Sequence, residues 1–175
     1  MKKIFAIILA LVTLMSLCAC KKAEDFSKLT LNAEGFGQNL VNACSFGVTP
    51  EAVESNEAAI AASLDAFRID AADLNTVDGK PEFFYATTGN QSADFVMVLG
   101  AKDTDTAKKL SEGAIKNWID SLKKDSGYNP EEAPKLENCI NKVAGRYVIV
   151  ICAKDSAAAE AKLSELLTNA LKQNV

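Results

Sequence analysis

The sequence predicts an α+β domain, in which a four-stranded antiparallel sheet carries packed helices and is preceded by N-terminal helices. Three observations predict this class. Two amphipathic helical stretches come first. Two segments follow, each of which reads strand, turn, strand and helix. The second segment repeats the first at a constant offset, which is typical of a duplicated supersecondary unit.

The two N-terminal helices are expected at residues 33–43 and 51–67, where apolar residues recur at intervals of three and four. In the first stretch, Phe36, Leu40 and Val41 form such a set. Residues 69–79 are acidic and turn-like, and they end in a typical turn sequence, Asp78-Gly79. We therefore expect two helices and a turn before the sheet.

Four strands are predicted, two in each repeated segment. The first segment holds residues 82–87 and a strand that starts at Phe95, and the second holds residues 138–143 and 147–151. Short turns separate the strands of each pair, so each pair is expected to form an antiparallel hairpin. The strands are apolar on both alternations, which suggests that both sheet faces are covered or that the chain forms an oligomer.

The repeat extends from the strands into the helices that follow them. The matched pairs, at an offset of 52 residues, include Val96 with Val148, Val98 with Val150 and Ala107 with Ala159. Asp103 and Asp155 stand where a helix N-cap belongs, because their carboxylates can accept backbone N–H bonds. We expect two β-hairpin–helix units whose two helices cover one face of the sheet.

The N-terminus carries the pattern of a bacterial lipoprotein signal. Lys2 and Lys3 precede an apolar run of 14 residues, 4–17, which ends in Leu17-Cys18-Ala19-Cys20. A transmembrane helix is the alternative, but a bilayer span needs roughly 20 residues. The pattern predicts a signal peptide at residues 1–19 and acylation of Cys20. Acyl chains on Cys20 would bind membrane lipid and hold the protein on the extracytoplasmic face of the cell membrane.

Cleavage before Cys20 divides the remaining chain into a lipidated tether, residues 20–32, and a single domain, residues 33–175. Loss of Lys2 and Lys3 would leave 17 basic against 23 acidic residues, a net charge of about −6. This balance argues against nucleic acid as a partner, because nucleic-acid binding needs a basic face.

Composition also excludes the catalytic mechanisms that need histidine. The sequence contains no histidine, which removes serine–histidine and cysteine–histidine nucleophilic catalysis. A serine–lysine pair stays conceivable, since lysines accompany Ser92, Ser111, Ser126, Ser156 and Ser164, but no motif frames one. We expect no enzyme, no catalytic residue and no cofactor.

A metal site is not expected either. Asp103 and Asp105 are candidate cation ligands together with Asp73 or Asp78, because Asp73-Leu74-Asn75 begins like a calcium loop. Val77 and Phe84 occupy the positions of the later ligands, so the required spacing fails. Helix capping and solvation account for these acids.

Three cysteines lie beyond the anchor: Cys44, Cys139 and Cys152. Cys139 and Cys152 flank the second predicted hairpin, so they could lie near each other. An exported location permits a disulfide, but free cysteines are also common as small buried apolar residues. The sequence favours the unpaired interpretation and leaves the pairing open.

Two features are candidates for recognition. Trp118 lies on the apolar stripe of the first repeat helix, so it is expected in the core rather than as a ligand platform. Tyr85, Thr87, Thr88, Asn90 and Gln91 surround the first hairpin tip and could form a recognition surface.

Several short motifs resemble those of one family. The chain has Tyr128 and Pro130, then Lys135-Leu136-Glu137-Asn138, then Gly145-Arg146-Tyr147-Val148 before an apolar strand and a helix. This series resembles the domain of unknown function 4358 (DUF4358) family over roughly residues 69–171. Members of that family are typically small lipoproteins of Gram-positive bacteria, which agrees with the N-terminal pattern. The resemblance implies no catalytic residue.

Together these observations predict a lipid-anchored, non-enzymatic module. It would bind an envelope protein or another envelope component through its sheet or its hairpin tips. The alternative is a small-ligand receptor or a lipoprotein accessory to a transporter, although 156 residues are few for a two-lobed binding protein.

Overall fold

The structure, a computed structural model, describes residues 24–89, 91–124 and 130–173. The predicted signal peptide and Cys20 lie outside these residues, as does Tyr128. Among the described residues, no helix has the length and apolar character that crossing a membrane requires.

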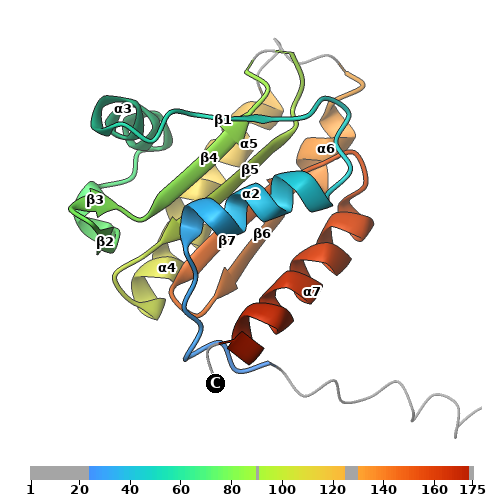
Figure 1. Cartoon of the computed structure of the whole chain (residues 1–175). Helices are drawn as coiled ribbons and strands as arrows, with labels where there is room; N and C mark the ends of the chain where they lie inside the picture. The colour runs from blue at the N-terminus through green and yellow to red at the C-terminus, as the bar shows by residue number, and fades with distance from the viewer. Residues whose placement is uncertain (1–23, 90, 125–129, 174–175) are drawn as a thin grey trace, which may run out of the picture.

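The centre of the protein is a five-stranded antiparallel sheet with the strand order β1-β4-β5-β7-β6 (Figure 1). The strands are β1 (Glu51–Ala52), β4 (Phe83–Thr87), β5 (Phe95–Gly100), β6 (Ile140–Ala144) and β7 (Tyr147–Cys152). The four predicted strands are all present, and each hairpin is antiparallel.

The prediction of four strands misses β1. This strand has only two residues, both exposed, and it pairs through its backbone with the edge of β4 at Glu51↔Thr87 and Ala52↔Ala86. So short an exposed strand has no apolar alternation that a sequence could reveal. The helix expected at residues 51–67 is correspondingly shorter. It is α3 (Glu57–Phe67), and its N-cap Asn56 accepts a hydrogen bond from the Ala59 N–H.

Helices cover both faces of the sheet. One face, which we call the α2/α7 face, carries α2 (Ala33–Ala43) and α7 (Ser156–Gln173). The other, the α3/α5 face, carries α3, α4 (Thr104–Leu110) and α5 (Lys116–Lys124), with a π-helical segment (Ser111–Ile115) between α4 and α5. The prediction that both repeat helices cover one face is wrong, because α4 and α5 lie opposite α7.

The pairing register explains this difference. Val96 lies directly opposite Ile151, so both point to the α2/α7 face. Val148 is three residues from Ile151, and side chains alternate along a strand, so Val148 points to the α3/α5 face. Residues matched by the repeat therefore lie on opposite faces in the strands. The helix positions Ala107 and Ala159 are nevertheless both buried, and the structure does not confirm a duplicated unit.

Smaller elements connect these layers. They are a 3₁₀ turn (Ala71–Asp73), a hairpin of β2 (Thr76–Val77) and β3 (Lys80–Pro81), and α6 (Ala133–Glu137). Both predicted N-caps form: the Asp103 carboxylate accepts from the Thr106 N–H at 2.7 Å, and Asp155 accepts from the Ala158 N–H at 3.0 Å. The Asp78-Gly79 turn also forms, and both of its residues have positive φ.

The chain packs into the core before residue 33. Leu29 and Leu31, which the sequence assigns to the tether, are buried in the cluster of the α2/α7 face. The Tyr147 hydroxyl accepts from the Leu31 N–H at 2.9 Å, which fixes this segment to β7. The described part of residues 20–32 therefore belongs to the packed domain.

Helix α2 approaches the sheet most closely at Gly37. A Cβ at this position would overlap the ring of Phe84 on β4, whereas a Cβ at Gly35, one half-turn away, would make only an ordinary contact with Asn32. Gly37→Ala should lower the free energy of unfolding by about 1–2 kcal/mol, because overpacking outweighs the gain in helix propensity.

Urea unfolding followed by circular dichroism measures this difference, with Gly35→Ala as the matched control. The control should be neutral or slightly stabilising, since it gains the same propensity without the overlap. Equal stabilisation by both substitutions would contradict the close packing of α2 on β4.

Candidate functional site

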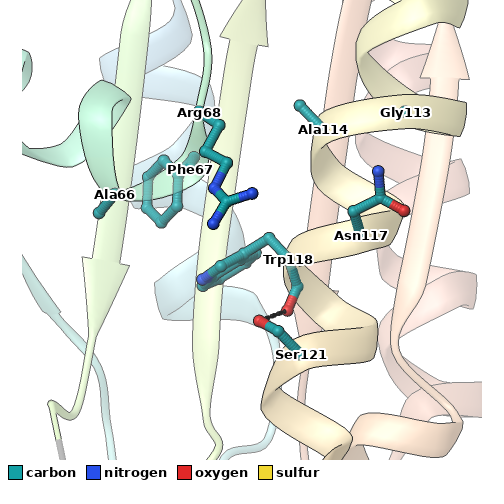
Figure 2. A pocket seen from close by; sticks show the side chains of 8 residues that line it. All are labelled: Ala66, Phe67, Arg68, Gly113, Ala114, Asn117, Trp118 and Ser121. Atoms are coloured by element: carbon teal, nitrogen blue, oxygen red, sulfur yellow. Dashed lines mark hydrogen bonds between the residues drawn. The ribbon is translucent and has the colours of Figure 1, made fainter.

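A cavity of about 460 Å³ opens between the C-terminal end of α3 and the first turns of α5 (Figure 2). Its volume falls in the range of sites that hold small ligands or a peptide side chain. Eight residues line it: Ala66, Phe67, Arg68, Gly113, Ala114, Asn117, Trp118 and Ser121.

Aromatic rings form one wall of the cavity. Trp118 packs edge-on against Phe67, with ring centroids 4.7 Å apart, and against Phe95 of β5 at 4.9 Å. Tyr85 of β4 also contacts Phe67, at 5.0 Å. Trp118 is only half-buried, so the prediction of a core position is correct for one side of the ring. Its other side lines the cavity.

Among the described residues of the lining, Arg68 is the one with a cationic side chain. It is exposed, and Figure 2 shows its guanidinium extending from the end of α3 toward the Trp118 ring. Within the described residues, no hydrogen bond or ion pair engages this guanidinium. Five donors are therefore free to bind an acceptor in the cavity.

The backbone of Arg68 is unusual. It has φ 57° and ψ 43°, the left-handed conformation, and it ends α3 in a Schellman motif. The Arg68 N–H donates to the Asp65 carbonyl and the Ile69 N–H donates to the Leu64 carbonyl, both at 2.9 Å. Glycine is the usual residue here, since most side chains other than those of Asn and Asp cost about 1–2 kcal/mol. A strained arginine at a cavity points to a role for its side chain.

The π-helical segment shapes the opposite wall. Such a segment inserts an extra residue into a helical turn, which frees carbonyls from their usual partners, and it is common at functional sites. Here the Asn141 amide of β6 donates to the Ser111 carbonyl at 3.0 Å, while the Ser111 hydroxyl donates to the Asn141 side-chain oxygen at 2.9 Å. Gly113 lies in this segment without a side chain, which leaves room in the cavity.

The lining groups suit binding rather than bond cleavage. The eight described lining residues include no carboxylate, cysteine or lysine, and the Ser121 hydroxyl is engaged, since it donates to the Trp118 carbonyl at 2.6 Å. The cavity therefore presents an aromatic wall, a free guanidinium and the Asn117 amide.

A serine and a lysine considered from the sequence do lie close together, but they lie outside the cavity. Ser92 and Lys135 both contact Asp94 Oδ2, at 2.7 Å and 2.8 Å, and Lys135 also pairs with Glu132 at 2.7 Å. Burial alone would lower the pKa of Lys135, but its hydrogen bonds to the two carboxylates raise it above the ordinary value. Lys135 therefore stays protonated and cannot serve as a general base.

Asp94 is the centre of this cluster, and its side chain is fully buried. Burial would raise its pKa, but hydrogen bonds from Lys135, Ser92 and the Val48 N–H outweigh burial, so the pKa lies below the usual range. The cluster joins the β4–β5 turn, α6 and the loop after α2. It stabilises one end of the sheet.

The family motif at residues 145–148 forms a second polar cluster, at the other end of the sheet. Arg146 pairs with the buried Glu82 at 2.6 Å and donates to the Tyr147 hydroxyl at 2.7 Å. Gly145 has φ 59°, and a Cβ there would overlap the Phe26 carbonyl. These motif residues join the N-terminal segment to the sheet. Glu82 was not singled out from the sequence, because one glutamate at a strand edge carries no distinct signal.

Two of the acids considered as cation ligands have clear structural roles. Asp73 pairs with Lys102 at 3.1 Å, and Asp103 caps α4. The described residues contain no group of three or more Cys, Asp or Glu side chains that could hold a metal ion. At the first hairpin tip, the Thr88 hydroxyl donates to the Ser92 carbonyl, and Tyr85 belongs to the aromatic cluster. Asn90 lies outside the described residues.

A family model with the description "Domain of unknown function (DUF4358)" matches residues 52–153, which is more than half of the chain. The chain belongs to the DUF4358 family. No curated protein and no solved structure matches it. The DUF4358 match starts earlier than the motifs suggested, and it includes all eight residues that line the cavity. It leaves out both helices of the α2/α7 face.

Sequence reasoning did not identify Arg68. Two signals were present: α3 ends without a glycine, in Phe67-Arg68-Ile69, and Gly113 interrupts an otherwise amphipathic helix. Neither is specific without the structure, because only the fold brings these two segments together.

The strain at Arg68 allows a test that separates stability from function. Arg68→Gly should raise the free energy of unfolding by about 0.5–1 kcal/mol, because glycine adopts positive φ without the steric cost. The gain is smaller than the full steric cost, since glycine loses more entropy on folding. Thermal unfolding measures this difference. Asp78→Gly is the matched control: it also removes a positive-φ side chain, but aspartate tolerates that conformation, so little change is expected. A destabilised Arg68→Gly protein would show that the arginine serves packing.

Proposed function

We propose that this protein is a lipid-anchored, extracytoplasmic binding module without enzymatic activity. Its cavity between α3 and α5 would hold an apolar side chain of an envelope protein together with a neighbouring carboxylate. The observation that carries the proposal is the strained Arg68 beside the half-exposed Trp118, with no partner for its guanidinium in the part of the chain that the structure describes.

The lining suggests the chemistry of the bound segment. The Trp118 and Phe67 rings offer an apolar surface, and buried aromatic anchors supply much of the energy of protein interfaces. The Arg68 guanidinium suits a carboxylate, which it can bind through two parallel hydrogen bonds. A partner segment in which an apolar residue stands next to an acidic residue would contact both the aromatic rings and the guanidinium.

The chemistry of the chain supports a non-enzymatic role. It has no histidine, and Lys135 is held protonated beside two carboxylates. The hydroxyls of Ser92 and Ser121 are engaged in hydrogen bonds, to Asp94 and to the Trp118 carbonyl. The carboxylate beside Ser92 is a weak base, because the pKa of Asp94 lies below the usual range.

The proposed anchor constrains where such a partner lies. Phe26 packs against the core, and it is only six positions after Cys20. Even a fully extended chain of that length reaches about 20 Å. An acylated Cys20 would therefore keep the domain close to the bilayer, so the proposed partner is a membrane protein or a protein held near the membrane.

The alternative function is a small-ligand receptor or a lipoprotein accessory to a transporter. The observation that favours it is the volume of the cavity, about 460 Å³, which suits a small molecule as well as a side chain. The ligand would combine an apolar body with an anionic group, for the same reasons.

Crosslinking in cells distinguishes these functions. A photoreactive residue in place of the exposed Asn117 in the full chain should give a discrete adduct with an envelope protein. Arg68→Gly should reduce the adduct at least tenfold, because a charge-assisted hydrogen bond contributes about 1.5–3 kcal/mol. Asp78→Gly is the control and should leave the yield unchanged.

A photoreactive residue at Glu160, exposed on α7, reports neighbours of the opposite face. The same adducts from both positions would contradict a specific partner of the cavity. If neither position gives an adduct, the small-ligand alternative gains support. It would then be tested through the fluorescence of Trp118, the one tryptophan of the chain.

The anchor has its own test. Cys20→Ala should abolish lipid labelling and leave uncleaved or mislocalised precursor, because the substitution removes the acylated sulfur. Metabolic labelling with a fatty acid and detergent partitioning measure this outcome. Cys44→Ala is the matched control and should retain label. Unchanged labelling and partitioning of the Cys20→Ala protein would overturn the assignment of the anchor.

A further inference from the structure

Cys139 and Cys152 occupy opposite positions on neighbouring strands. In the β6–β7 hairpin, Ile140 pairs with Ile151 and Ala144 pairs with Tyr147. Continuing this register by one pair places Cys139 directly opposite Cys152. Opposite residues of an antiparallel pair have Cα atoms about 4.5–5.5 Å apart, and a disulfide requires about 4.4–6.8 Å.

The position of the pair within the hairpin is also favourable. The turn has two residues, Gly145 and Arg146, so Ala144 and Tyr147 form a hydrogen-bonded pair, and the two types of pair alternate from there. Cys139 and Cys152 fall at a non-hydrogen-bonded pair, where side chains lie closer together. In agreement, the Cys139 N–H donates to the Leu136 carbonyl, not to β7.

Both thiols are free in the structure, and Cys139 lies near enough to Cys152 to affect its titration. A hydrogen bond to Cys139 and then burial raise the pKa of the Cys152 thiol. Cys139 is half-buried and Cys152 is fully buried. Cys139 is thus the thiol that a reagent from solution reaches first.

Cys44 cannot compete for either partner. It packs against the cluster of the α2/α7 face, whereas Cys139 and Cys152 belong to the cluster of the α3/α5 face. The sheet separates the two sides. Of the three cysteines in the described residues, this leaves one possible pair.

We infer that Cys139 and Cys152 form a cross-strand disulfide that closes the β6–β7 hairpin in the exported protein. In the cell this rests on the extracytoplasmic location given under Proposed function, since disulfides persist in oxidising compartments. The oxidant is a disulfide, either a small molecule or a protein. The Cys139 thiolate attacks one of its sulfur atoms and releases the first thiol.

The deprotonated Cys152 sulfur then attacks the Cys139 sulfur of the mixed disulfide and releases the second thiol. Two protein thiols and one external disulfide thus become one protein disulfide and two external thiols. The two protons and two electrons lost by the protein are accounted for in those thiols.

The bond would link the end of α6 to the end of β7. Cys139 directly follows α6, whose Lys135 holds Asp94 at the end of the β4–β5 turn, and Cys152 lies opposite Phe95. Closing the hairpin therefore fixes α6 to the sheet beside the aromatic wall of the cavity. The disulfide would stabilise this end of the α3/α5 face.

The experiment has two arms, both on the full chain. In the first, cells are quenched in acid, free thiols are alkylated, and the protein is isolated and mapped by mass spectrometry without reduction. A peptide containing Cys139 should be linked to one containing Cys152, and Cys44 should be alkylated. Cys139→Ser should leave Cys152 alkylated, and Cys44→Ser should leave the linkage unchanged.

In the second arm, the purified, reduced protein in detergent is equilibrated with oxidised glutathione, which tests the geometry without reference to location. The same linkage should form, and its reduction should lower the melting temperature by about 5–10 °C, since closing such a loop constrains the unfolded chain. Cys139→Ser should show no such redox dependence.

Linkage in both arms supports the inference. Linkage only with glutathione supports the pairing and counts against the extracytoplasmic location. Alkylation of Cys139 and Cys152 in both arms would overturn the inference, whatever the location of the protein.

Discussion

The constraint on which the rest of this structure depends is the burial of β5 and β7 on both faces. Every residue of these two central strands is buried. An antiparallel sheet often leaves one face in water, but strands that are apolar on both alternations need a helical layer on each side. The chain meets this need with α2 and α7 on one face and with α3, α4 and α5 on the other. The position of every candidate site follows from this three-layer arrangement.

The cavity arises where two segments of the α3/α5 face meet without filling the space between them. Phe67 and Trp118 bring α3 and α5 together through their rings, with centroids 4.7 Å apart. Beside this contact the helix wall carries Gly113, which has no side chain, and Ala114, whose side chain is a single methyl, and this leaves a hollow. Asn141 stabilises the π-helical turn that contains them. Arg68 lies at the edge of this hollow because the Schellman motif ends α3 there and turns the chain back toward the sheet.

Features with a local cause were predictable from the sequence. Helix α2, the four long strands and the N-caps at Asp103 and Asp155 all follow from patterns within a few residues, whereas the sequence left open whether helices or a second copy cover the second face. Features that depend on long-range pairing were not. The strand β1 exists only through its pairing with β4. The side of the sheet that each helix covers depends on the register between β5 and β7. A slip of one residue would have given the expected arrangement from nearly the same apolar pattern. The cavity was missed for the same reason, since Arg68 and Trp118 are 50 positions apart and gain meaning only as neighbours.

The family match and the layered arrangement together suggest that the two faces of the sheet have different roles. Residues 52–153 contain the four long strands and the whole lining of the cavity, whereas α2 and α7 lie outside that range. The α2/α7 face also receives Leu29 and Leu31, which follow the proposed anchor and precede α2. Tyr147 holds this segment through hydrogen bonds to both the N–H and the carbonyl of Leu31, and Arg146 links the same hydroxyl to Glu82. A membrane attachment joined so firmly to one face would restrict how the domain turns, and the cavity lies on the other face. The α2/α7 face would then set the orientation of the domain, and the α3/α5 face would meet the partner.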